Sequence, residues 1–126
     1  QDAIACAKKD IRHHGGEIMN KKIGVDEASR ILADVRAEQS FWVNDGPIIR
    51  NIHEMVGVLA NLNEGTFRQH VNQDKNDIAN WVRYVLGDEM LANSLIKIKS
   101  KEKILKAMRE RVKYLEKSID NANKMI

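Results

Sequence analysis

The sequence predicts a mainly α-helical single domain with one short β-hairpin, at about residues 41–50, and a long amphipathic C-terminal helix. Along most of the chain, apolar residues recur every three or four positions, the period of a helix with one buried face. Phe41-Trp42-Val43 is instead rich in residues that favour strands. The length of 126 residues fits one domain, and such a chain can bury a sufficient core without disulfides or structural metal.

The N-terminal part is expected to contain two helices. Residues 1–12 are alanine-rich, and the adjacent glycines 15 and 16 end that helix because glycine disfavours helical backbone. A second helix is expected from about Asp26 to Gln39, where acidic residues favour the start and apolar residues follow at helical spacing. Arg30, Asp34 and Glu38 would lie on its solvent side. Residues 1–40 would then be a helical extension of a helical domain over residues 41–126.

The expected hairpin pairs Phe41-Trp42-Val43 with Ile48-Ile49-Arg50 around the turn Asn44-Asp45-Gly46-Pro47. Neighbouring side chains on a strand point to opposite faces. Either Trp42 or the pair of Phe41 and Val43 therefore packs on the helices. If Trp42 faces outward, it is a candidate contact for a protein partner, because tryptophan often carries binding energy at interfaces.

Local capping patterns mark the next helices. Asn51 followed three residues later by Glu54 is typical of a capping box, and it precedes a helix to about Ala60. Further helices are expected over residues 63–71, 77–85 and 88–96, with Gly87 ending one and Asp88 capping the next. Trp81 shares the apolar face of the second of these and is predicted to lie in the core.

The last and longest helix is expected to begin at Ser100. Its apolar residues form a heptad-like seam of under three heptads, comprising Ile104, Met108, Val112, Leu115, Ile119 and Ala122. Two interpretations stay open. The helix folds back on its own domain, which is the favoured one, or the seam forms a homo-oligomer.

Charge is unevenly distributed along the chain. Residues 1–96 carry 11 basic and 14 acidic side chains, whereas residues 97–126 carry 10 basic and 4 acidic ones. Such asymmetry indicates an anionic partner. The candidate contacts to nucleic acid are Lys97, Lys99, Lys103, Lys106, Arg109 and Lys113. A solvated helix face with pairs such as Glu102–Lys106 and Glu110–Lys113 is favoured, because the cations do not converge on one stripe and no aromatic residues interleave with them.

Several spaced motifs resemble a DUF5752-like domain of unknown function found in archaea and bacteria. They are Phe41-Trp42-Val43-Asn44-Asp45-Gly46, Thr66-Phe67-Arg68-Gln69-His70-Val71-Asn72, Lys75-Asn76-Asp77-Ile78-Ala79-Asn80-Trp81-Val82 and Leu86-Gly87-Asp88-Glu89. The resemblance covers about Phe41 to Ile119, although similar proteins usually carry a second aromatic residue near Ile78. It implies a compact small domain, often attached to other segments, and it implies no established activity.

The polar residues His70, Asn72, Asn76 and Asp77 are the candidates for chemistry. A catalytic or metal site would use His70 as base or ligand with Asp77 as its partner. The favoured interpretation is a corner between two helices, where His70 bonds terminal carbonyls and Asn76 or Asp77 starts the next helix. A lone histidine and aspartate form an incomplete site.

The sequence contains no zinc, calcium, nucleotide-binding or activated-nucleophile motif. We therefore expect no catalytic, cofactor-binding or metal-binding residues. Cys6, the single cysteine, is expected to be a small buried hydrophobe, which fits a cytoplasmic setting. No apolar stretch reaches the ~20 residues of a membrane-spanning helix, and the first residues lack the charge order of a signal peptide.

The sequence therefore predicts a cytoplasmic, non-enzymatic helical module that binds an unidentified protein partner. The alternative is an accessory nucleic-acid-binding protein that uses the basic C-terminal helix.

Overall fold

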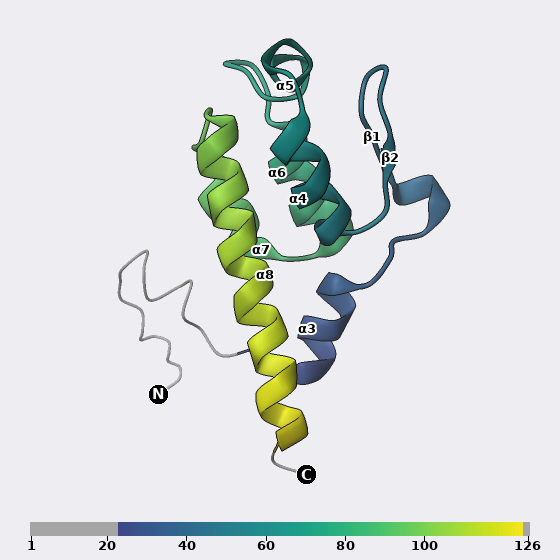
Figure 1. The fold of residues 1–126 in the computed structure, drawn as a ribbon, viewed down its shortest axis with the longest axis vertical. Coiled ribbons are helices and arrows are strands. Elements are labelled where there is room, and N and C mark those ends of the chain that lie inside the picture. Colours follow the sequence, from purple (N-terminus) through teal and green to yellow (C-terminus); the bar gives the residue numbers. More distant parts are fainter. Residues whose placement is uncertain (1–22, 125–126) are drawn as a thin grey trace.

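The computed structural model describes residues 23–124, which form a mainly helical chain with a two-stranded antiparallel hairpin and a C-terminal helix of 24 residues (Figure 1). This confirms the predicted fold class. The expected helix over residues 1–12, with Cys6 in it, lies outside the described residues.

Helix α3 (Val25–Leu32) is shorter than predicted, since it ends at Leu32 and not near Gln39. Beyond it the backbone is extended, and the Val35 N–H donates to the Arg50 carbonyl at 2.7 Å. Asp34 Oδ1 accepts from Asn51 Nδ2 at 2.6 Å. These long-range bonds replace helical ones, and only a 3₁₀ turn, η1 (Ala37–Gln39), follows.

The hairpin consists of β1 (Phe41–Trp42) and β2 (Ile48–Ile49), paired in the register Phe41↔Ile49 and Trp42↔Ile48. The turn is closed by the Gly46 N–H, which donates to the Val43 carbonyl at 3.0 Å. A Cβ at Gly46 would lie 2.8 Å from Val43 Cγ1, so a larger residue there would force the Val43 side chain to shift.

Asparagine side chains start the next three helices: α4 (Ile52–Asn61), α5 (Glu64–His70) and α6 (Asp77–Trp81). The side-chain oxygens of Asn51, Asn63 and Asn76 accept from the backbone N–H three residues later at 2.8, 2.8 and 2.9 Å. Only half of the predicted capping box forms, because the Glu54 carboxylate accepts from the N–H of Arg50, at 2.8 Å, and not from that of Asn51.

Helix α6 continues directly into a π-helical turn, η2 (Val82–Leu86), which the sequence did not predict. Gly87 ends it with a left-handed φ of 75°, as expected of a glycine after a helix. Asp88 then caps α7 (Glu89–Leu95) by accepting from the Leu91 N–H at 3.2 Å. Arg30, expected to face solvent, also donates to the Leu86 carbonyl at 3.0 Å.

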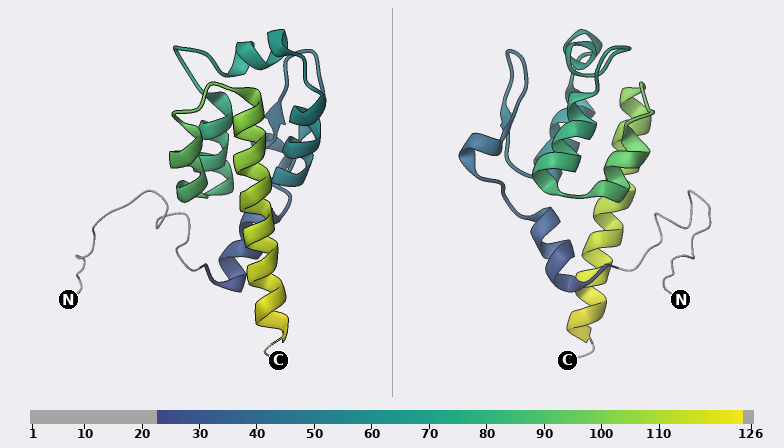
Figure 2. Two further views of the ribbon diagram at one scale, coloured as in Figure 1. Left: turned by 60° about the vertical axis from the view of Figure 1, so that its left-hand side comes forward. Right: turned by 180° about the vertical axis from the view of Figure 1, so that it is seen from behind.

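Helix α8 (Lys101–Lys124) lies along α4 and α7 with its first half and beside α3 with its second half (Figure 2). Its seam residues Ile104, Met108 and Val112 lie in the main core, and Leu115 packs in a second cluster with Ala28 and Ile31 of α3. The helix thus folds back on its own domain, as favoured. Self-association through the seam stays a prediction.

Candidate functional site

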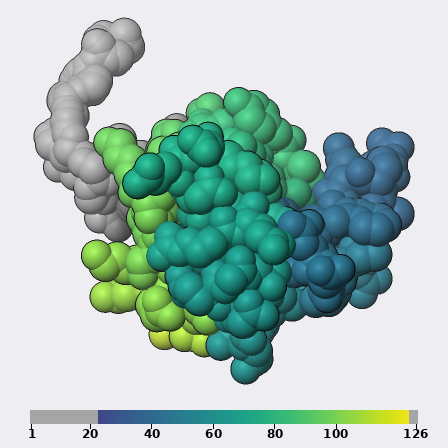
Figure 3. Space-filling view, turned by 90° about the horizontal axis from the view of Figure 1, so that it is seen from above, coloured from purple at the N-terminus to yellow at the C-terminus, as the bar shows by residue number. Residues whose placement is uncertain are grey.

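Trp42 and Ile48 form the outward face of the hairpin. Their side chains are 66% and 49% exposed, and the two residues lie directly opposite each other in the strand register. Phe41, Val43 and Ile49 point the other way and are buried. The alternative left open by the sequence is therefore resolved, with Trp42 facing out. The hairpin projects from the side of the helical body (Figure 3).

An aromatic base supports the inner face of the hairpin. The Phe41 ring meets the Trp81 ring edge-on, with centroids 5.8 Å apart, and lies 5.1 Å from the His70 ring. Trp81 is buried, as predicted, and its Nε1 donates to the Gln39 carbonyl at 2.9 Å. These contacts therefore hold in place the hairpin backbone that carries Trp42 and Ile48.

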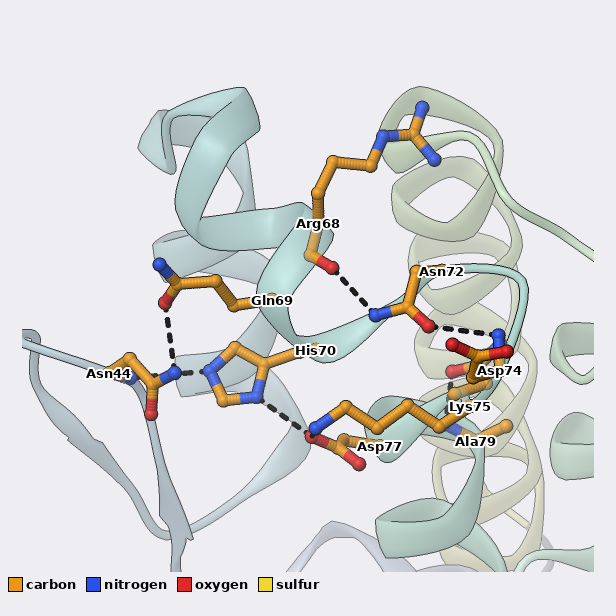
Figure 4. Close-up of polar contacts among 10 residues, drawn as sticks. Asn44, Arg68, Gln69, His70, Asn72, Asp74, Lys75, Asp77 and Ala79 are labelled. Carbon is orange, nitrogen blue, oxygen red and sulfur yellow. Dashed lines mark hydrogen bonds and ion pairs between the residues drawn. The ribbon is translucent and has the colours of Figure 1, made fainter.

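His70 ties the hairpin turn to the helices (Figure 4). Its Nε2 accepts from the Asn44 N–H at 3.2 Å, so its Nδ1 carries the proton and donates to Asp77 Oδ2 at 3.0 Å. Lys75 Nζ lies 3.1 Å from the same carboxylate oxygen. Asn44 makes a second bond, from its side chain to Gln69 Oε1, at 2.8 Å.

This arrangement fits the predicted helix corner better than a catalytic or metal site. Both ring nitrogens of His70 are engaged, and its side chain is only 8% exposed. Asn76 is the residue that caps α6. One expectation is wrong: His70 bonds a turn N–H and a carboxylate, not terminal carbonyls, because the hairpin lies against the end of α5.

The six candidate nucleic-acid contacts, Lys97, Lys99, Lys103, Lys106, Arg109 and Lys113, are all exposed. Lys99 Nζ donates to the Asn72 carbonyl at 3.0 Å. Acidic residues share the exposed side of α8, namely Glu102, Glu110, Glu116 and Asp120. Neither pair expected from the spacing is present, and within residues 23–124 Glu116 instead pairs with His53 at 3.3 Å.

Arg111, one of the basic residues of this segment, is buried in an ion pair and is not exposed to solvent. It is 1% exposed and binds the buried Asp88 through two bonds, Nε to Oδ2 at 2.7 Å and Nη2 to Oδ1 at 2.9 Å. The sequence did not predict this pair. The available signal was spacing, because Arg111 follows Met108 by three residues and precedes Leu115 by four, which puts it on the apolar side of the helix.

Among residues 23–124, no three histidine, cysteine, aspartate or glutamate side chains are grouped so that they could hold a metal ion. Within the same part of the chain, no helix has the length and apolar character needed to cross a membrane.

Comparison with known proteins gives no relative: no family model, no curated protein and no solved structure matches the chain. The resemblance to a DUF5752-like domain therefore stays a prediction from its motifs.

Proposed function

We propose that this chain is a cytoplasmic, non-enzymatic protein-interaction module that binds its partner through the Trp42–Ile48 face of the hairpin. The observation that carries the proposal is the exposure of Trp42, at 66%, on a strand whose other residue, Phe41, is buried. The engagement of both His70 ring nitrogens supports the non-enzymatic part.

An exposed tryptophan beside an exposed isoleucine offers a partner a compact apolar surface. Burying an aromatic side chain removes a large apolar area from water and adds specific ring contacts. The strand that carries Trp42 is already ordered by the Phe41 contacts and the Asn44–His70 bond, so binding costs little further conformational entropy. These properties are typical of an interface anchor.

The proposal is tested by capturing partners from an extract of the native host after nuclease treatment. We expect a protein that the wild-type chain retains and that the Trp42→Ala/Ile48→Ser variant loses. Tyr84→Ala is the matched control, because Tyr84 is an aromatic residue that is 77% exposed outside the hairpin. Equal retention by the wild type and the hairpin variant contradicts the proposal.

The second candidate function is nucleic-acid binding by the basic C-terminal segment. One observation favours it: among the described residues, none forms an ion pair with the exposed cations Lys97, Lys103, Lys106, Arg109 and Lys113. Phosphate contacts require basic side chains that are not already engaged in ion pairs. The acidic residues interleaved on α8 count against it.

A further inference from the structure

A small cavity of about 220 Å³ lies between α4 and α8. It is lined by His53 and Val56 from α4 and by Arg109, Val112 and Lys113 from α8. Val112 is buried and Val56 half-buried, whereas the three polar residues are exposed. The cavity therefore has an apolar floor and a rim of basic side chains.

We propose that this groove docks an acidic amphipathic segment of a partner protein. One apolar side chain of the segment packs against Val56 and Val112, and neighbouring carboxylates bind Arg109 and Lys113. The inference rests on the proposed role in protein binding, but it uses none of the hairpin residues. Binding at one surface can therefore be refuted without refuting binding at the other.

The size of the cavity fits a single side chain. Sites for drug-sized ligands usually occupy about 300–1,000 Å³, more than the 220 Å³ available here. A pocket of one side chain is instead the common form of an anchor site at protein interfaces, where one buried residue contributes much of the binding energy.

The charges of the rim select an acidic occupant. Arg109 and Lys113 lie four residues apart on α8, so they are neighbours on one helix face. Within residues 23–124 neither forms an ion pair, while the adjacent Glu116 is held by His53 at 3.3 Å. Arginine can bind a carboxylate through two parallel hydrogen bonds.

The apolar floor favours a protein segment over nucleic acid. A phosphate backbone gains affinity from several cations in succession, and it has no aliphatic side chain to fill the space between Val56 and Val112. An amphipathic acidic segment supplies both the apolar group and the carboxylates in one short length.

The test is a titration of the isotope-labelled full chain with a capped peptide of about 15 residues, long enough to form a helix, with leucine and glutamate at helical spacing. We expect saturable shifts of the Val56 and Val112 amide signals. The same peptide with lysine for glutamate, or alanine for leucine, should bind at least about tenfold more weakly.

Arg109→Glu/Lys113→Glu should weaken binding of the acidic peptide by about tenfold or more. The matched control, Lys97→Glu/Lys103→Glu, makes the same change of charge at exposed residues outside the cavity and should have a much smaller effect. Trp42→Ala should leave the titration unchanged. Loss of groove binding with retained Trp42-dependent partner capture would therefore refute the groove alone.

Three results would overturn the inference. The first is an absence of saturable shifts at Val56 and Val112. The second is equal binding of the acidic and lysine-containing peptides. The third is a duplex oligonucleotide that binds the same residues more tightly than the acidic peptide, which would assign the groove to nucleic acid.

Discussion

The Nε2 atom of His70 accepts a hydrogen bond from the backbone N–H of Asn44 at 3.2 Å, which joins the end of α5 to the hairpin turn. A hairpin with two-residue strands is marginal by itself. It keeps its place because His70, Phe41 and Trp81 hold it against the helices. The outward position of Trp42 therefore depends on the residues behind it.

Replacing His70 with phenylalanine should loosen this attachment. His70→Phe keeps an aromatic ring beside Phe41 but leaves the Asn44 N–H without its acceptor and the Asp77 carboxylate with Lys75 alone. Losing such partners typically costs about 1–3 kcal/mol, measurable by urea unfolding. Amide exchange at Asn44 should also accelerate. Gln69→Ala, which removes only the exposed bond to the Asn44 side chain, serves as the control, and equal effects of both variants would argue against the role of His70.

Removing one member of the buried Arg111–Asp88 pair should destabilise the fold far more than replacing both members. Arg111→Met leaves the Asp88 carboxylate charged and buried without its partner, which typically costs about 3–5 kcal/mol. Adding Asp88→Asn removes the stranded charge and keeps an oxygen for the cap of α7, so the double variant should recover much of the loss. A double-mutant cycle of unfolding free energies measures this, and additive losses would refute the coupling.

Glu54 should make the free energy of unfolding depend on pH in the acidic range. The backbone N–H and the guanidinium of Arg50 bond its charged form, which lowers the pKa of this carboxyl below its ordinary value of 4.5. The stabilisation is present above the unfolded-state pKa and is lost as pH falls through the lower folded-state pKa. Below pH 4.5 the wild type should therefore lose stability faster than Glu54→Gln. Parallel stability curves for the two proteins would contradict this.

Nucleic acid should bind the chain only weakly at physiological salt. If α8 did contact phosphates at four to six points, log affinity for duplex DNA would fall against log salt with a slope of about −4 to −6. Reversing Lys103, Lys106 and Lys113 to glutamate would then abolish binding without unfolding the domain, because exposed charges contribute little to stability. Tight, salt-dependent binding that this triple reversal removes would favour the alternative function.

The features that the sequence predicted well depend on nearby residues. Asn51 and Asp88 could be recognised as helix caps, and Asn76 as one of two candidates beside Asp77, because a cap bonds an N–H three residues later. The buried position of Trp81 follows from apolar spacing within its own helix. For Trp42 the sequence left two orientations, outward or toward the helices, because strand geometry fixes which neighbouring side chains share a face.

The features that it missed depend on distant partners. Helix α3 ends early because Val35 and Asp34 bond Arg50 and Asn51, which local propensity does not reveal. Asp88 could be read as a cap but not as the partner of Arg111. The cavity required Val56 and Val112, from two different helices, to face each other.

Binding through the Trp42–Ile48 face is tested by measuring both the stability and the partner binding of one variant. Trp42→Ala/Ile48→Ser should unfold within about 0.5 kcal/mol of the wild type, as exposed substitutions usually do, yet lose the protein that the wild type captures from nuclease-treated extract. Tyr84→Ala should keep both properties. A hairpin variant that is equally stable and still captures the same protein would show that the Trp42–Ile48 face is not the binding surface.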